Sequence, residues 1–208
     1  MIQNIDLIKK IIPINAVVAN ATNEITINSI KIATENNLIK PILVGRIDLI
    51  KPILEKLDWD SHDLEIVEAS NESESALISC QMAKKDEASL IIKGHMHTDV
   101  LMSEYIKSEH SLRLKGERLS HIWFMTFPND KRDPIIISDG ALNIKPSLET
   151  KKSIITNVVN FLNKIKDFEA KIAILSATEE VLDQMESSSD ASKLLDWSKK
   201  IYPNLKIF

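Results

Sequence analysis

The sequence has little glycine and almost no cysteine, and each shortage excludes a class of protein. Only four glycines occur among 208 residues. Their spacing is incompatible with a G-x-G-x-x-G dinucleotide loop, with a P-loop, or with a G-x-S-x-G nucleophile elbow. A single cysteine, Cys80, excludes an internal disulfide and a thiolate metal cluster. Because Cys80 stands in a helix-like run, we interpret it as a small buried side chain.

Strong net charge and long apolar segments are also missing. The formal net charge of −4 gives no electrostatic reason to expect nucleic acid or an anionic membrane as a partner. No apolar run approaches the roughly 18 residues that a membrane span needs, and the first twenty residues do not have the pattern of a signal peptide. A hydrophobic content of 44% is ordinary for a globular protein with a core. We therefore expect a cytoplasmic protein.

Strand-like and helix-like runs alternate through the first half of the chain. Strands are expected at 14–19, 41–45, 64–69 and 89–92, with helices at 23–37, 48–57 and 72–85. Asp48 is expected to cap the second of these helices, with Pro52 in its first turn. This alternation is typical of βαβ units and a largely parallel sheet.

The pattern changes after about residue 110. Two strands, at 122–127 and 134–137, are joined by a short turn-rich connector, 128–133, which is typical of an antiparallel hairpin. Then follow an amphipathic helix opened by Ser147, a strand, a polar loop and a last helix, at 148–165, 171–175, 186–190 and 191–201. We predict an α/β fold of two lobes, residues 1–115 and residues 116–208, with the hairpin in the second.

The richest polar stretch, Lys93-Gly94-His95-Met96-His97-Thr98-Asp99, follows the expected strand 89–92. Chemistry in α/β proteins collects at the carboxyl ends of strands. A cation, an imidazole and a hydroxyl at a strand–helix junction would suit an anion, but Thr98 would equally serve as a plain helix cap. A metal hydrolase site on His95, His97 and Asp99 is a third interpretation. A helix that begins near Thr98 would break the alignment of those three residues.

Two further polar loops follow expected strands. Ser138–Asn143 contains Asp139 and Asn143, which either bind a substrate or organise the loop through bonds to the backbone. Ser176–Glu180 ends the next strand in the same way. A basic run, Arg113 to Arg118, is either a solvated surface or a receiver for a phosphate or the nucleotide end of coenzyme A.

Five motifs, in this order and spacing, resemble the phosphate acetyltransferase/phosphate butyryltransferase family, and its butyryl-type branch looks closer. They are PILVG (41–45), KGHMHTDVL (93–101), RLSH (118–121), DGALNIKP (139–146) and KIAILSATE (171–179). The resemblance implies a two-lobed fold with mostly parallel sheets and helices on both faces, related to isocitrate/isopropylmalate dehydrogenases. It implies a phosphate acyltransferase, which transfers an acetyl or butyryl group reversibly between coenzyme A and inorganic phosphate. Coenzyme A is then a substrate, and neither a metal nor a cofactor is implied.

The resemblance also implies which residues bind substrate. By position these are Lys93, His97, Thr98, Arg118, Asp139, Asn143 and Glu179. Lys93 and Arg118 would meet anionic oxygens, whereas Thr98 and Asn143 would donate hydrogen bonds.

The family's pattern continues beyond Phe208, and the residues credited with its catalysis lie in that continuation. We therefore expect a C-terminally incomplete fold with an unpaired sheet edge. Two hypotheses stay open for its function. One is an acyltransferase that works as a homodimer or with a partner chain supplying the missing segment. The other is a truncated remnant, or half of a split enzyme, that binds coenzyme A or phosphate without turnover.

Overall fold

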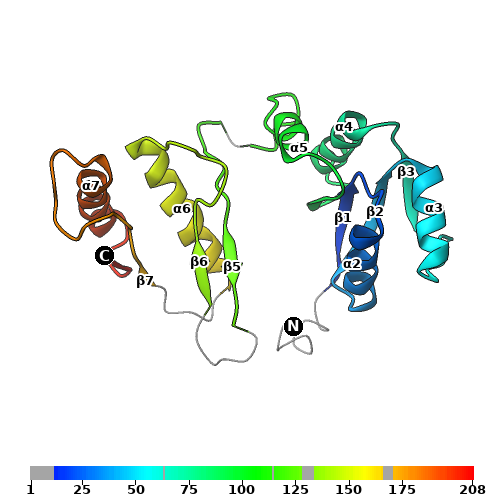
Figure 1. Ribbon diagram of the computed structural model, residues 1–208, viewed down its shortest axis with the longest axis horizontal. Helices are drawn as coiled ribbons and strands as arrows, with labels where there is room; N and C mark the ends of the chain where they lie inside the picture. Colours follow the sequence, from blue (N-terminus) through cyan, green and yellow to red (C-terminus); the bar gives the residue numbers. More distant parts are fainter. Residues whose placement is uncertain (1–11, 63, 114, 128–133, 166–170) are drawn as a thin grey trace. The chain divides into compact units, whose positions relative to one another are not determined.

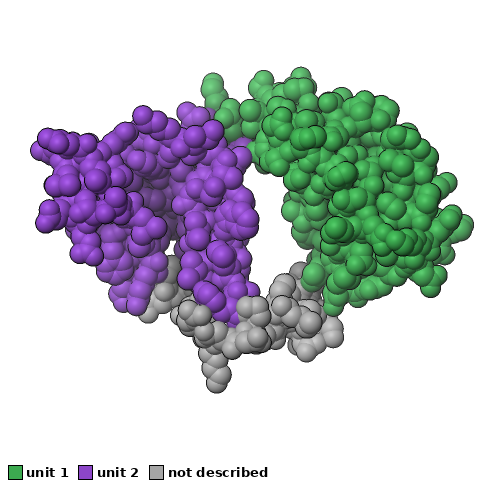
Figure 2. Space-filling view, viewed as in Figure 1, with its two compact units in different colours: residues 1–115 green, residues 116–208 purple. Residues whose placement is uncertain are grey.

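The computed structural model describes residues 12–62, 64–113, 115–127, 134–165 and 171–208. The chain divides into two compact units, Met1–Lys115 and Gly116–Phe208, which Figure 2 colours separately. The connector expected at 128–133 and the first eleven residues lie outside the described residues.

The first unit is built on a four-stranded parallel sheet (Figure 1). Its elements are β1 Ile14–Ala19, α2 Glu24–Glu35, β2 Ile39–Gly45, α3 Ile47–Lys56, β3 Glu65–Glu68, α4 Glu72–Lys84, β4 Leu90–Lys93 and α5 Thr98–Tyr105. The strand order is β3-β2-β1-β4. Ala19 pairs with Val44 on one side and with Lys93 on the other, so three strands end at one level. The predicted alternation and parallel sheet are confirmed.

Helices cover both faces of this sheet because its central strands are apolar on both sides. Val18 and Leu43 pack in one cluster with residues of α2 and α3. Val17 and Val44 pack in another cluster with residues of α4. All four side chains are fully buried. The predicted helices on both faces are thus confirmed for this unit.

The predicted start of α3 is wrong. The helix begins at Ile47 with Arg46 as its N-cap, and Asp48 lies in the first turn, where it pairs with Arg46. Pro52 consequently lies inside the helix rather than in its first turn. Proline has no N–H to donate to the carbonyl four residues earlier, so the helix lacks one internal hydrogen bond there.

Cys80 is fully buried in α4, as predicted. Burial raises the pKa of its thiol to about 11. The thiol is therefore protonated at neutral pH and is a poor nucleophile.

Within its described residues, the second unit contains two small sheets and two long helices (Figure 1). Its elements are β5 Trp123–Met125, β6 Ile135–Ile137, α6 Leu148–Ile165, β7 Lys171–Ile172, α7 Glu186–Ile201 and β8 Lys206–Ile207. The strands β5 and β6 pair in antiparallel register, which confirms the predicted hairpin, while β7 and β8 are parallel. Ile155 and Val159 of α6 pack on Leu194 of α7.

The polar loop predicted at 186–190 is wrong, because α7 begins at Glu186. The buried hydroxyl of Ser188 accepts from Leu182 N at 2.8 Å and lies 3.4 Å from Met185 O, to which it donates. Asp190 pairs with Lys151 of α6 at 2.7 Å. These polar side chains therefore stabilise the start of a helix. In the parts of the chain that the structure describes, no helix is long and apolar enough to cross a membrane.

Candidate functional site

The loop after β4 lies at the point where the strand order of the sheet reverses. From β1 the chain continues to β2 and β3 on one side, and β4 then pairs with the other side of β1. In open α/β sheets, ligands bind in the crevice outside the carboxyl ends of such neighbouring strands. Asn20 follows β1 and Gly94 follows β4. The polar stretch singled out in the sequence thus occupies the position where this kind of sheet binds ligands.

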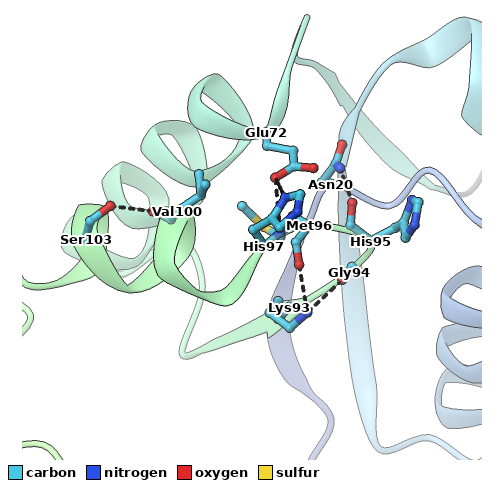
Figure 3. Close-up of polar contacts among 9 residues, drawn as sticks. All are labelled: Asn20, Glu72, Lys93, Gly94, His95, Met96, His97, Val100 and Ser103. Carbon is cyan, nitrogen blue, oxygen red and sulfur yellow. Dashed lines mark hydrogen bonds and ion pairs between the residues drawn. The ribbon is translucent and has the colours of Figure 1, made fainter. Parts of the chain in front are cut away.

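Gly94 fixes the loop against the end of β1. Its N–H donates to Ala19 O at 2.8 Å, and His95 N donates to Asn20 O at 3.0 Å. The side-chain amide of Asn20 donates back to His95 O (Figure 3). A Cβ on Gly94 would stand 2.5 Å from Asn20 O and 2.6 Å from Ala19 O. Only glycine allows the two backbones to approach this closely.

The first turn of α4 is held on the same sheet edge. The buried hydroxyl of Ser75 accepts from Asn20 N at 2.6 Å and donates to Val44 O at 3.3 Å. Asn71 caps the helix, because its side chain accepts from Glu74 N at 3.0 Å. The helix start is therefore fixed relative to the ends of β1 and β2, and so is its first residue, Glu72.

Glu72 binds His97 twice. Its Oε2 accepts from His97 N at 3.0 Å and lies 3.0 Å from Nδ1 of the same residue (Figure 3). The hydrogen bond from the ring is the main reason why the pKa of His97 is raised. The backbone N–H of His97 is the main reason why the pKa of Glu72 is lowered. Sequence reasoning found His97 but missed Glu72, because no motif connects residues 25 positions apart.

Lys93 ends β4, before His97, and Thr98 follows His97 directly. The Lys93 ammonium donates to Met96 O at 2.8 Å (Figure 3). Thr98 is the first residue of α5, whose N-cap is His97, and the His97 side chain makes no capping hydrogen bond. The interpretation of Thr98 as a plain cap is therefore wrong, and its side chain is exposed.

The metal interpretation of His95, His97 and Asp99 finds no support in the geometry. Asp99 lies in the first turn of α5, as the helix argument predicted. Among the described residues, the one group of three potential ligands whose atoms lie within 4.8 Å of one another is Glu104, Glu109 and His110. Glu104 in that group already pairs with Lys107 and His110, each at 2.6 Å.

In the second unit, Asp139 organises its own loop. Its Oδ1 accepts from the backbone N–H groups of His121, Ala141 and Leu142 at 3.2, 3.0 and 3.1 Å. Its Oδ2 accepts from Asn143 N at 3.2 Å and from the Asn143 side chain. Although burial opposes it, these hydrogen bonds lower the pKa of Asp139. The carboxylate is thus occupied by the loop itself.

Asn143 joins this loop to the segment that follows Arg118. Its side-chain amide donates to Leu119 O at 2.9 Å and to Asp139, so both of its hydrogens are used. Asn143 was predicted to donate a hydrogen bond to substrate, but its amide group is used within the protein. The group left for other contacts is its side-chain carbonyl oxygen. The structure therefore brings the RLSH and DGALN motifs together. Arg118 and Glu179 have exposed side chains, and Glu179 lies in the loop after β7.

Comparisons with known proteins agree on one family. The family profile described as phosphate acetyl/butaryl transferase matches residues 48–207. A phosphate acetyltransferase from Rickettsia typhi is 37% identical over 166 residues, which are 78% of this chain and 46% of the relative. A phosphate butyryltransferase from Clostridium acetobutylicum is 30% identical over 184 residues, which are 88% of this chain and 60% of the relative. The sequence motifs predicted the butyryl-type branch, whereas the identity is higher with this acetyltransferase.

The fold is similar to that of solved phosphotransacylases. The crystal structure of a branched-chain phosphotransacylase from Enterococcus faecalis V583 superposes with a TM-score of 0.71 at 23% identity. The match covers 88% of this chain and 63% of that one. This chain spans about half the length of the curated relatives it matches, from 46% to 60% in the two relatives above.

Proposed function

The chain belongs to the phosphate acetyl/butaryl transferase family, and on that basis we propose that it serves the reversible transfer of an acetyl or butyryl group between coenzyme A and inorganic phosphate. The main support is the loop at the β1–β4 switch point, which falls within the family match. This loop carries an ammonium group, a carboxylate-bound imidazole and an exposed hydroxyl on Lys93, His97 and Thr98.

The proposed reaction needs groups that hold an anion and stabilise a developing charge. In one direction the thiolate of coenzyme A attacks the carbonyl carbon of an acyl phosphate. A C–S bond forms, the C–O bond to phosphate breaks, and phosphate leaves with the electron pair. In the other direction phosphate attacks the thioester and the thiolate leaves. Preorganised cations and donors lower the barrier to both directions. We assign Lys93 and Arg118 to anionic oxygens and Thr98 to a hydrogen bond with the substrate.

The remaining substrate-binding residues are proposed to act through the loops that carry them. Asp139 and Asn143 fix the conformation of their loop, and Asn143 also offers its side-chain carbonyl oxygen. Glu179 is exposed after β7. We assign no catalytic base to this chain. We propose that the base lies in the part of the family's length that the chain does not span, and that a partner chain or a continuation of this one provides it. A homodimer and a cytoplasmic location also belong to the proposal, as do coenzyme A as substrate and the absence of a metal cofactor.

Phosphorolysis of acyl-coenzyme A tests the proposal directly. Acetyl- and butyryl-coenzyme A are incubated with phosphate and the purified chain, and free thiol is measured. The assay is run with and without the C-terminal part of the Rickettsia typhi relative that lies beyond the match. We expect thiol release that falls about 100-fold in Lys93→Ala, since a lost oxyanion partner has effects of this order.

Lys51→Ala is the matched control, because Lys51 is also exposed but lies on α3, outside the proposed site. It should retain full activity. Absence of thiol release from folded protein in the presence of the added segment would contradict acyl transfer. Calorimetric binding of coenzyme A in that case would favour the remnant that binds without turnover.

A further inference from the structure

We infer that Glu72 is a positioning residue, which holds the His97 imidazole through Nδ1 so that Nε2 is the nitrogen that meets a phosphoryl oxygen of the substrate. This inference rests on the proposed acyl transfer and deepens it. It assigns a role to a residue that no sequence motif marks, and it names the substrate atom on which His97 acts.

One carboxylate oxygen of Glu72 contacts both the backbone and the ring of His97. One oxygen of Glu72 lies 3.0 Å from the backbone N and 3.0 Å from Nδ1 of His97. The backbone contact positions the carboxylate, and the ring contact then sets the orientation of the imidazole. Glu72 is itself fixed, since the first turn of α4 is held by Asn71 and by buried Ser75. The Glu72 side chain is 33% exposed and the His97 side chain is 78% exposed. The carboxylate is therefore the sheltered partner, and the imidazole is the partner that a ligand can reach.

The contact with Glu72 also decides which nitrogen carries a proton. An ionised carboxylate only accepts hydrogen bonds, so Nδ1 of His97 is protonated whether the ring is neutral or charged. In the charged ring Nε2 is also protonated and donates. Glu72 and Asp99 raise the pKa of His97, whereas Lys93 lowers it. His95 acts on Glu72, whose pKa it lowers. Glu72 thus favours the charged ring with a donating Nε2.

A phosphoryl group is the ligand that fits this loop. Lys93 is anchored by its bond to Met96 O and places a second cation on the loop that carries His97. Two cationic donors on one short loop suit an anion with several oxygens. The negative charge of Glu72 is compensated by the imidazolium. The phosphoryl group belongs to inorganic phosphate, to an acyl phosphate or to coenzyme A, and these three sources can be tested separately.

Nuclear magnetic resonance of the histidine side chains tests the positioning role in the full chain. Long-range 1H–15N spectra report the tautomer and the pKa of each ring, and His97→Gln identifies the His97 signals. We expect the Nδ1–H tautomer at high pH and a lower pKa of His97 in Glu72→Gln. Glu74→Gln removes a carboxylate from the same helical turn and should leave His97 unchanged. An Nε2–H tautomer, or an unchanged pKa in Glu72→Gln, would overturn the inference.

Titrations with inorganic phosphate, acetyl phosphate and coenzyme A, at matched ionic strength with chloride, identify the ligand. We expect the Nε2 signal of His97 to respond, and Glu72→Gln to weaken the binding about two- to fivefold, as for a single exposed charge pair. A response to coenzyme A alone assigns the phosphoryl group to coenzyme A. His95→Gln, a matched change in the same loop, should bind normally. No response of His97 to any of the three would refute the inference.

The thiol-release assay separates this inference from the proposed function. Thiol release with the same phosphate KM in Glu72→Gln and in the unsubstituted chain would contradict the positioning role and leave acyl transfer standing. A response of His97 to phosphate that depends on Glu72, without thiol release in the presence of the added segment, would contradict acyl transfer and support the positioning role.

Discussion

Gly94→Ala should destabilise the first unit, because the added methyl group has no space. The new Cβ would lie 2.5 Å from Asn20 O, 2.6 Å from Ala19 O and 2.9 Å from Asn20 C. All three are backbone atoms of β1 or of the residue after it, and no side-chain rotation relieves the overlap. The loop must therefore move away from β1, which lengthens the 2.8 Å bond from Gly94 N to Ala19 O.

The cost of this change follows from the contacts that it disturbs. Overpacking of a well-packed site costs about 1–3 kcal/mol, and a rigid backbone neighbour favours the upper half of that range. The free energy of unfolding falls by about 2 kcal/mol per M of urea in a typical protein, so a loss of about 2 kcal/mol lowers the urea midpoint by about 1 M. The phosphate response of His97 should weaken in the same variant, because His95 and His97 move with the loop.

Trp59 fluorescence during urea unfolding measures the effect in the first unit. Trp59 packs against the core of that unit, while the other two tryptophans, Trp123 and Trp197, lie in the second unit and are replaced by phenylalanine in every protein compared. Gly116→Ala is a control in the second unit that should leave the Trp59 midpoint unchanged, since a Cβ there meets nothing within 4 Å and only the φ of +87° is unfavourable. A midpoint shift in Gly94→Ala no larger than in Gly116→Ala would refute the steric argument.

Two further predictions concern polar groups that hold loops. Asp139→Ala removes the acceptor of several backbone N–H groups and should destabilise the second unit by about 2 kcal/mol, since each lost hydrogen bond contributes about 0.5–1.5 kcal/mol; faster hydrogen exchange over residues 139–143 would be the readout, and unchanged exchange would contradict it. Burial opposes a low pKa of Glu104, yet hydrogen bonds from Lys107 and His110 lower it below its ordinary value of 4.5. The stabilisation by ionised Glu104 is therefore present above about pH 4.5 and is lost as the pH falls through the lowered pKa. Acid unfolding followed by circular dichroism should have a shallower pH dependence in Glu104→Gln, and an unchanged profile would exclude this contribution.

Local patterns in the sequence were enough to predict the parallel sheet and most of the helices. β1 and β2 are short apolar runs between turn residues. Such strands can be predicted from residues that are adjacent in the sequence. One error arose where a side chain bonds to nearby backbone. Ser188 belongs to a serine-rich stretch that indicates a loop, yet its hydroxyl bonds to Leu182 and Met185 and stabilises the first turn of α7. Composition alone does not distinguish these two uses of serine.

The residues of the candidate site also differ in how far they could be predicted. Residues in one local stretch were predicted, whereas a residue that reaches the site through a distant contact was not. Lys93, His97 and Thr98 were predicted, because a strand end followed by polar residues is visible in the sequence. Glu72 was not predicted, since its contact with His97 spans 25 residues. Sequence reasoning left open whether Asp139 binds a substrate or organises its loop. The contacts to His121 N and to the following amides show the second use.

Asn20 explains why these distant residues meet. Its backbone N–H is accepted by Ser75 of α4, and its carbonyl and side-chain amide both bind His95 of the β4 loop. Its φ of 57° lies in the left-handed region, which asparagine tolerates better than most residues. The start of α4 and the loop after β4 are thus both positioned by the residue that follows β1. The pairing of Glu72 with His97 therefore depends on Asn20. A substitution at Asn20 should separate the pair even where both partners are intact.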